Sequence, residues 1–331
     1  MKKVLITGSN GLVGSEAVEH FSKTHYVIGI DNHQRSLLFD CGVSHNIFLS
    51  DNYVNLTLDI TNKPQMDLLF QEHVFDLIIH CAAQPSHDKS YDIPFTDFTI
   101  NTVGTLNLLE NFRTNCPEAV FIFMSTNKVY GSNPNNLPIT ELDNRYEIPA
   151  AINEAMSIDQ TLHSIFGASK ASADLLTQEY GRYFGLNTVC FRSGCISGKY
   201  QRPAKLHGFL GYLCGCANKN ETYEILGYKG KQVRDIIHSR DIVYAFDEFY
   251  KSPKCGEVYN IGGGKCNSCS ILEALDLVEK LSGIKINTTY NNQHRTGDHI
   301  CYYSDNSKFS NDYPLWNVRN SLEDIIKELL I

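Results

Sequence analysis

Three glycines near the N-terminus have the spacing of a phosphate-binding turn. They stand in Thr7-Gly8-Ser9-Asn10-Gly11-Leu12-Val13-Gly14, directly after the apolar run 4–6. The first glycine permits a tight turn, the second lets backbone amides approach a pyrophosphate, and the third lets the next helix pack closely. A helix that begins here points the positive end of its dipole at the phosphates. We therefore assign six residues to dinucleotide binding, namely Gly8, Asn10, Gly11, Leu12, Val13 and Gly14.

Asp31 indicates which dinucleotide this turn accepts. It ends the next strand-like run, 26–30, about twenty residues after the glycines. A carboxylate there hydrogen-bonds the ribose 2′-hydroxyl and repels a 2′-phosphate, so NAD is favoured over NADP. We place Asn32 at the same ribose. Arg35 is close in the chain, so NADP stays an alternative cofactor. The alternative is a glycine-rich turn and a surface Asp that bind no ligand. It does not explain why the glycine spacing, the preceding strand-like run and the acid after the next run occur together.

Two further strand ends carry residues suited to a flat ligand. Asp59-Ile60 follow a third strand-like segment, where a carboxylate can accept a hydrogen bond from the adenine amino group. Ala82, Ala83 and Gln84 follow the apolar run 77–79, and their small size lets a ligand lie against the backbone. Acidic or tightly packed strand ends are also common without a ligand, so the residues alone leave both roles open.

The elements that would position these residues alternate between strands and helices. Continuous apolar runs of strand length lie at 4–6, 26–30, 77–79 and 120–123. Apolar residues at helical spacing lie between them at 14–23, 66–73 and 99–114. Continuous apolar strands are typical of sheets covered on both faces. The order predicts an α/β fold with a Rossmann-type, doubly wound parallel sheet.

A smaller lobe is expected to follow the sheet domain. The irregular stretch 132–163 precedes a helix at 169–184 and a strand at 188–192. Beyond residue 198 we expect helices at 208–218, 241–250, 270–281 and 322–330 and short strands at 222–226 and 232–238. Residues 1–198 are thus expected to form mainly an NAD-binding Rossmann domain that includes a helix near 166–184. Residues 199–331 are expected to form mainly a mixed α/β substrate lobe, with chain crossings back to the sheet near 232–262.

Composition excludes several other classes of protein. Of the 331 residues, 42% are hydrophobic and 20% charged, which is too apolar for a disordered chain. Its 29 basic and 37 acidic residues give a net charge of −8 without a basic run, which disfavours nucleic acid. No apolar run reaches the ~20 residues that span a bilayer. The eleven cysteines have neither zinc-site spacing nor a signal peptide before them, so we expect reduced thiols in the cytoplasm and no metal.

The motifs occur in an order that resembles the extended short-chain dehydrogenase/reductase family of nucleotide-sugar epimerases and dehydratases. Beyond the residues named above, the resemblance rests on Asn101, Ser125-Thr126-Asn127-Lys128-Val129-Tyr130-Gly131, Gly167-Ala168-Ser169-Lys170, Phe191-Arg192 and 227–238. It implies an NAD-dependent epimerase that transiently oxidises a sugar hydroxyl and reduces the keto-sugar from the opposite face. It also implies cofactor roles for Asn101, Ser125 and Lys170. Segments 125–131 and 230–235 favour the branch that epimerises CDP-deoxyhexoses at C2.

The catalytic motif departs from the family at one position. Lys170 matches the lysine that hydrogen-bonds the nicotinamide ribose and lowers the pKa of a catalytic Tyr, and Thr126 matches the residue that holds the reacting hydroxyl. Four residues before Lys170, the family Tyr is Phe166, which has no ionisable group. A general base typically contributes ~10²–10⁴-fold. Three explanations are open: a base elsewhere, an introduced substitution, or an NAD-binding protein without turnover.

We favour a relocated base, because Thr126, Lys128 and Lys170 all remain. Proximity in the motifs makes four residues candidates for that base: Tyr130, His163, His87 and Lys128.

The resemblance also implies the substrate contacts. Arg234 stands where the family has an arginine on the substrate diphosphate, and Arg295 resembles a second one; a guanidinium can bind two phosphate oxygens at once. Further contacts are expected at His87, Asn127, Lys128, Gln201, His207 and Gln232. Dehydratases carry Asp-Glu where Asn127-Lys128 stands, which argues against the alternative of a dehydratase or decarboxylase.

A homodimer or homotetramer is implied as well, through the helix that carries the family lysine. Tyr180, Tyr183 and Phe184 are spaced for one face of that helix. We expect them to lie either in the core or in the contact between subunits.

Overall fold

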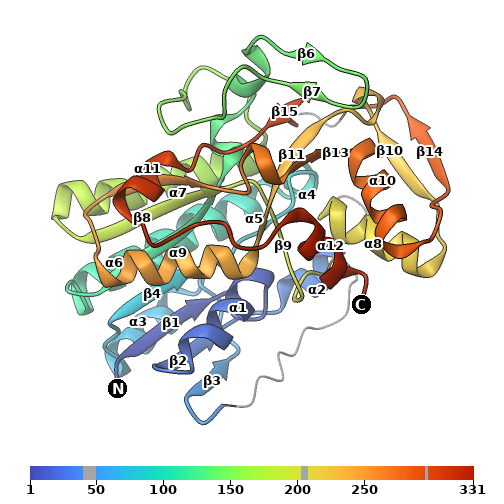
Figure 1. The fold of residues 1–331 in the computed structure, drawn as a ribbon. Coiled ribbons are helices and arrows are strands. Elements are labelled where there is room, and N and C mark those ends of the chain that lie inside the picture. The colour runs from blue at the N-terminus through green and yellow to red at the C-terminus, as the bar shows by residue number, and fades with distance from the viewer. Residues whose placement is uncertain (40–49, 203–207, 295–296) are drawn as a thin grey trace.

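A seven-stranded parallel sheet forms the centre of the computed structural model, which describes residues 1–39, 50–202, 208–294 and 297–331 (Figure 1). Its strands are β1 (Lys3–Thr7), β2 (Tyr26–Ile30), β3 (Tyr53–Leu56), β4 (Leu77–His80), β5 (Val120–Thr126), β8 (Asn187–Ser193) and β12 (Glu257–Ile261). Their order is β12-β8-β5-β4-β1-β2-β3, and every neighbouring pair is parallel. The order reverses between β1 and β4, as in doubly wound sheets. The predicted Rossmann-type fold is confirmed.

Helices cover both faces of this sheet (Figure 1). One face is covered by α1 (Leu12–Phe21), α9 (Ser239–Lys251) and α11 (Ser307–Asp312). The other face is covered by α3 (Lys63–Glu72), α6 (Gly104–Asn115) and α7 (Ile165–Phe184). Shorter helices α2 (Gln34–Phe39), α4 (Lys89–Asp92) and α5 (Pro94–Phe98) follow strand ends. None of the described helices is both long and apolar enough to cross a bilayer.

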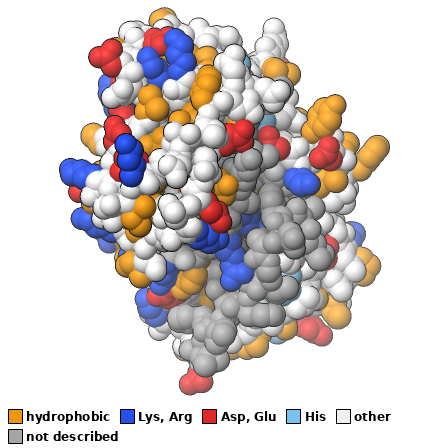
Figure 2. All heavy atoms as spheres, turned by 90° about the vertical axis from the view of Figure 1, so that its right-hand side faces the viewer, with side chains coloured by type: hydrophobic (Ala, Val, Ile, Leu, Met, Phe, Trp, Pro, Cys, Tyr) orange, Lys and Arg blue, Asp and Glu red, His pale blue; other side chains and the backbone are white. Residues whose placement is uncertain are grey.

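A second body of mixed structure lies beside the carboxyl ends of the strands (Figure 1). Its strands are β9 (Cys195–Ser197), β10 (Tyr223–Leu226), β11 (Val233–His238), β13 (Ser268–Ser270), β14 (Thr288–Asn291) and β15 (Cys301–Tyr302). Its helices α8 (Phe209–Lys219), α10 (Ile271–Ser282) and α12 (Leu322–Leu329) enclose a separate hydrophobic core. The chain returns from it to the main sheet through α9 and β12. On the face drawn in Figure 2, basic and acidic side chains are interspersed.

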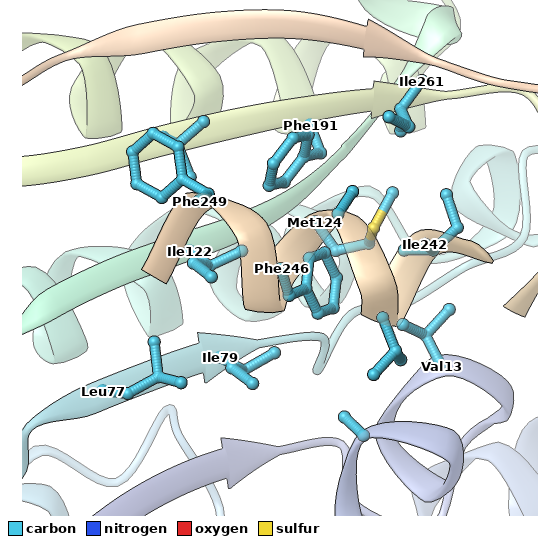
Figure 3. Close-up of a cluster of buried hydrophobic side chains, with 14 of the residues drawn as sticks. Val13, Leu77, Ile79, Ile122, Met124, Phe191, Ile242, Phe246, Phe249 and Ile261 are labelled. Atoms are coloured by element: carbon cyan, nitrogen blue, oxygen red, sulfur yellow. The ribbon is translucent and has the colours of Figure 1, made fainter. Parts of the chain in front are cut away.

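Side chains along each central strand alternate between two hydrophobic clusters. Val4 and Ile6 of β1 pack with α1 and α9, whereas Leu5 between them packs with α3 and α6. This alternation is the period of two that a strand imposes. Figure 3 shows Phe246 of α9 among the strand residues of the first cluster, including Ile122. The continuous apolar runs are therefore buried on both faces, as predicted.

Local capping explains where the helices at the site begin. Helix α7 begins at Ile165, earlier than the predicted 169, because the Ser164 hydroxyl accepts a hydrogen bond from the backbone N–H of Gly167 at 3.0 Å. The predicted helix 99–114 divides into a π-helical turn η1 (Thr99–Val103) and α6. The irregular stretch 132–163 contains one short antiparallel pair, β6 (Thr140–Glu141) with β7 (Tyr146–Glu147).

Candidate active site

A cleft of about 490 Å³ lies between the carboxyl ends of the central strands and the second body. It opens at the reversal of strand order, which is where doubly wound sheets bind their ligands. The cleft brings together most of the predicted site residues, namely Gly8, Asn10, Gly11, Leu12, Val13, Gly14, Asp31, Asn32, Asp59, Ile60, Ala82, Ala83, Gln84, His87, Ser125, Thr126, Asn127, Lys128, Phe166, Lys170, Gln201, Gln232 and Arg234. Two others, His207 and Arg295, lie outside the described residues.

The glycine turn is packed so tightly that side chains are excluded. Gly8 has a φ of +67°, and a Cβ placed on it would lie 2.7 Å from the backbone nitrogen of Ala82. A Cβ on Gly14 would lie 2.0 Å from the carbonyl oxygen of Gly8. The turn therefore holds the start of α1 against β1 and β4, with Gly11 facing the cleft. This backbone cradle fits the pyrophosphate of a dinucleotide.

Two carboxylates are fixed at the far end of the cleft. Asp31 accepts hydrogen bonds from the backbone N–H groups of Asn10 (3.0 Å) and His33 (2.8 Å). At Asp59, burial acts to raise the pKa, but hydrogen bonds from Thr61 and Asn32 outweigh it, so the pKa is lowered. Both carboxylates are thus held in place as hydrogen-bond acceptors, as a ribose and an adenine require.

Asn101 was predicted to contact the cofactor, but it does not line the cleft. It is buried in the π-helical turn, where its side-chain oxygen accepts a hydrogen bond from the backbone N–H of Gln84 at 2.9 Å. Its amide nitrogen donates to the hydroxyl of Ser169 at 3.0 Å. Asn101 therefore ties the loop after β4 to helix α7, and so positions Gln84 and the neighbour of Lys170.

Helix α7 presents Phe166 and Lys170 to the cleft from successive turns. The Lys170 ammonium donates to the carbonyl oxygen of Met124 at 2.8 Å and lies 4.0 Å from the centroid of the Phe123 ring. Burial lowers its pKa to about 8. Phe166 is 8% exposed, so an aromatic ring occupies the family position but offers no proton acceptor.

Strand β5 ends beside these two residues. Ser125 donates to the carboxylate of Asp174 on α7 at 2.5 Å. The Thr126 side chain caps the turn η2 (Asn127–Tyr130) by accepting from the backbone N–H of Lys128 at 3.2 Å. The Thr126 hydroxyl therefore retains its proton for donation towards the cleft.

Two of the four candidate bases point away from the cleft. Tyr130 is fully buried; its hydroxyl donates to the Asn260 side chain at 2.7 Å and accepts from Arg192, and burial raises its pKa. His163 places its ring nitrogens at 3.1 and 2.8 Å from the carbonyl oxygens of Thr161 and Val129. Neither lines the cleft, so the geometry does not support catalysis by either one.

Asp298 links the two basic residues on the substrate side. Its carboxylate lies 2.8 Å from the ammonium of Lys128 and 2.8 Å from the guanidinium of Arg234. Near them Gln232 donates its amide to the Leu226 carbonyl at 2.9 Å, while its side-chain oxygen is buried with no partner among the described residues. The sequence did not single out Asp298, since only the fold brings it to β11.

Other lining residues were missed, mostly from the second body: Arg202, Tyr223, Glu224 and Tyr228. Tyr228 lies inside 227–238, the segment that carried the family resemblance, so that segment was the available signal. Arg35 lines the cleft too and donates to the carbonyl oxygen of Arg202 at 2.8 Å. This bond joins helix α2 to the loop after β9.

The fold and this cleft define a Rossmann-type enzyme that binds a dinucleotide beside a second ligand. Residues 4–262 match the model of the NAD dependent epimerase/dehydratase family. The chain belongs to this family, and its cofactor is NAD.

Known proteins of this family are similar over most of the chain. CDP-paratose 2-epimerase of Salmonella typhi is 33% identical, over 99% of this chain and 98% of its own length. dTDP-glucose 4,6-dehydratase 1 of Escherichia coli (strain K12) is 31% identical, over 84% of this chain and 77% of its own. The solved dTDP-glucose 4,6-dehydratase of Bacillus anthracis in complex with NAD superposes with a TM-score of 0.81 at 25% identity, covering 100% of this chain and 96% of that one.

Proposed function

We propose that this chain is an NAD-dependent nucleotide-sugar epimerase that inverts C2 of a CDP-deoxyhexose. One observation carries the proposal: the 33% identity to a CDP-paratose 2-epimerase extends over nearly the whole of both chains. Bound NAD would accept a hydride from the sugar and return it. The cleft residues supply the remaining tasks, which are to hold the hydroxyl, to move its proton and to bind the phosphates.

The residues after Thr126 support epimerisation over dehydration. Dehydration needs an acid and a base next to the sugar in addition to NAD, which the dehydratases of this family carry as Asp-Glu. Here the same positions hold Asn127, which is buried, and Lys128, which pairs with Asp298. The other carboxylates of the described lining, Asp31, Asp59 and Glu224, belong to other parts of the cleft.

The substrate phosphates would meet Lys128 and Arg234. Both are cations with little exposure, and Asp298 at present neutralises part of their charge. A diphosphate would compete with this carboxylate for the same donors. Because the chain carries a net charge of −8, such local cations must provide the attraction for an anionic ligand.

Phe166 favours a second candidate, a protein that binds NAD without turnover. One experiment separates the candidates. Bound dinucleotide is identified in the purified protein, which is then incubated with CDP-, UDP-, GDP- and dTDP-sugars in deuterated water and followed by NMR. Inversion of C2 in a CDP-sugar supports the proposal, loss of water or carbon dioxide indicates a dehydratase or decarboxylase, and bound NAD with no conversion indicates the non-catalytic protein.

We further propose that the chain works as a homodimer in the cytoplasm. Helices α5, α6 and α7 pack together, and with the turn η1 they carry exposed apolar side chains at Phe95, Phe98, Val103, Leu106, Leu175, Tyr183 and Phe184. Phe95 is 89% and Tyr183 80% exposed, which is unusual for aromatic rings on one surface. The described cysteines are all free, which supports a reducing compartment.

A further inference from the structure

His87 and Lys128 are the two candidate bases that line the cleft. His87 lies between β4 and α4, and its side chain is 12% exposed. Its Nε2 atom is buried and has no hydrogen-bond partner among the described residues. A buried polar atom without a partner destabilises the fold, so this nitrogen calls for a role that a ligand completes.

Gly297 packs so closely against this nitrogen that no side chain would fit between them. A Cβ placed on Gly297 would lie 2.9 Å from Nε2 of His87 and 3.6 Å from the backbone nitrogen of Ser164. Ser164 caps α7, the helix that carries Phe166 and Lys170. The Gly297 carbonyl in turn accepts from the Lys128 ammonium at 3.4 Å. Through Gly297, His87 therefore lies near the N-terminal end of α7, where Ser164 precedes Phe166 by two residues.

The other groups near the reaction centre are committed elsewhere. Lys128 is paired with Asp298 at 2.8 Å, and the Lys170 ammonium donates to the Met124 carbonyl. Cys195 lines the cleft, but burial raises the pKa of its thiol to about 11, which leaves it protonated at neutral pH. The charged group on the other side of the imidazole is Asp88, whose carboxylate lies 4.0 Å from Nδ1. Of the two ring nitrogens, Nε2 is the one that is buried without a hydrogen-bond partner among the described residues.

We propose that His87 is the catalytic base that replaces the hydroxyl missing at Phe166. This assignment rests on the proposed epimerase function. The hydroxyl proton of the sugar moves to Nε2 while the C–H hydride passes to NAD, so the carbon becomes a ketone and the cofactor is reduced. In the second half the hydride returns to the opposite face of the ketone, and the proton returns from Nε2 to the oxygen. Atoms and electrons balance without any further reactant.

The test compares His87→Gln and His87→Ala with the matched control His20→Gln, whose ring lies beside Asp247 on the far side of α1. We expect His87→Gln to lower kcat about 100-fold or more while CDP affinity, measured by calorimetry, stays within about threefold. Added imidazole should rescue His87→Ala but not His87→Gln, whose side chain still fills the site. Adding Phe166→Tyr to His87→Gln should restore turnover.

A second measurement is independent of turnover. In NMR spectra the imidazole signals of His87 should shift on addition of the CDP-sugar and respond less to CDP alone, because the sugar is what the ring contacts. Turnover by His87→Gln within about threefold of the unaltered protein would overturn the role of His87 and leave the epimerase function standing. Failure of the unaltered protein to convert any nucleotide sugar would instead overturn the function itself.

Discussion

Asp31 is the side chain that we expect to set the cofactor preference of the cleft. It is held by two backbone N–H groups, so it is preorganised as the acceptor proposed for the ribose. A hydrogen bond to a charged group contributes about 1.5–3 kcal/mol. We expect Asp31→Ala to weaken NAD binding about 10- to 100-fold and to reduce discrimination against NADP, since Arg35 lines the same region. Calorimetric titration with both dinucleotides measures this, and unchanged NAD affinity would remove Asp31 from the ribose site.

The buried ammonium of Lys170 lowers the stability of the fold at neutral pH. Burial lowers its pKa from 10.5 to about 8, so the folded state disfavours the charge at neutral pH. The penalty is full below about pH 8, shrinks as the pH rises towards 10.5, and vanishes above it; at pH 7 it is about 3 kcal/mol. We expect Lys170→Met to raise the unfolding free energy of the cofactor-free protein by about 2–3 kcal/mol at pH 7 and by about half as much at pH 9.5. Urea unfolding at both pH values tests this, and a gain independent of pH would contradict it.

At the scale of elements, helix α7 positions the reacting side chains through its first turn. The Ser164 hydroxyl caps the helix, and the loss of such a cap typically costs about 1 kcal/mol. We expect Ser164→Ala to lower the unfolding free energy by about that amount and to raise the mobility of residues 165–170, measured by hydrogen exchange. Ser172→Ala on the exposed side of the same helix is the control and should change stability by less than about 0.5 kcal/mol. Equal effects of the two substitutions would show that the cap is unimportant.

Elements that depend on neighbouring residues could be predicted from the sequence, whereas contacts between residues far apart in the chain could not. The glycine turn and the buried strands follow from local backbone geometry and from apolar runs, so the sheet and the cofactor end of the cleft could be read from the sequence. The direction of Tyr130 and His163 depends on how the stretch 132–163 folds over β5, which no spacing reports. Asp298 reaches Lys128 and Arg234 because the chain passes the cleft a last time before β15. Such long-range pairs need the folded structure.

At the scale of the whole molecule, the apolar surface of α5, α6 and α7 remains to be covered. A second copy of the chain would bury Phe95 and Tyr183, each worth about 1.5–3 kcal/mol when fully buried. We expect sedimentation to give a mass about twice the 37.3 kDa of the chain. Tyr183→Glu and Phe95→Glu should shift the protein to monomers, whereas Leu315→Glu, equally exposed but near α11, should not. If the unaltered protein is monomeric, the chain forms no dimer. If the dimer survives both substitutions, the contact lies elsewhere. None of these exposed apolar side chains belongs to the described cleft, so cofactor binding should survive dissociation of the dimer.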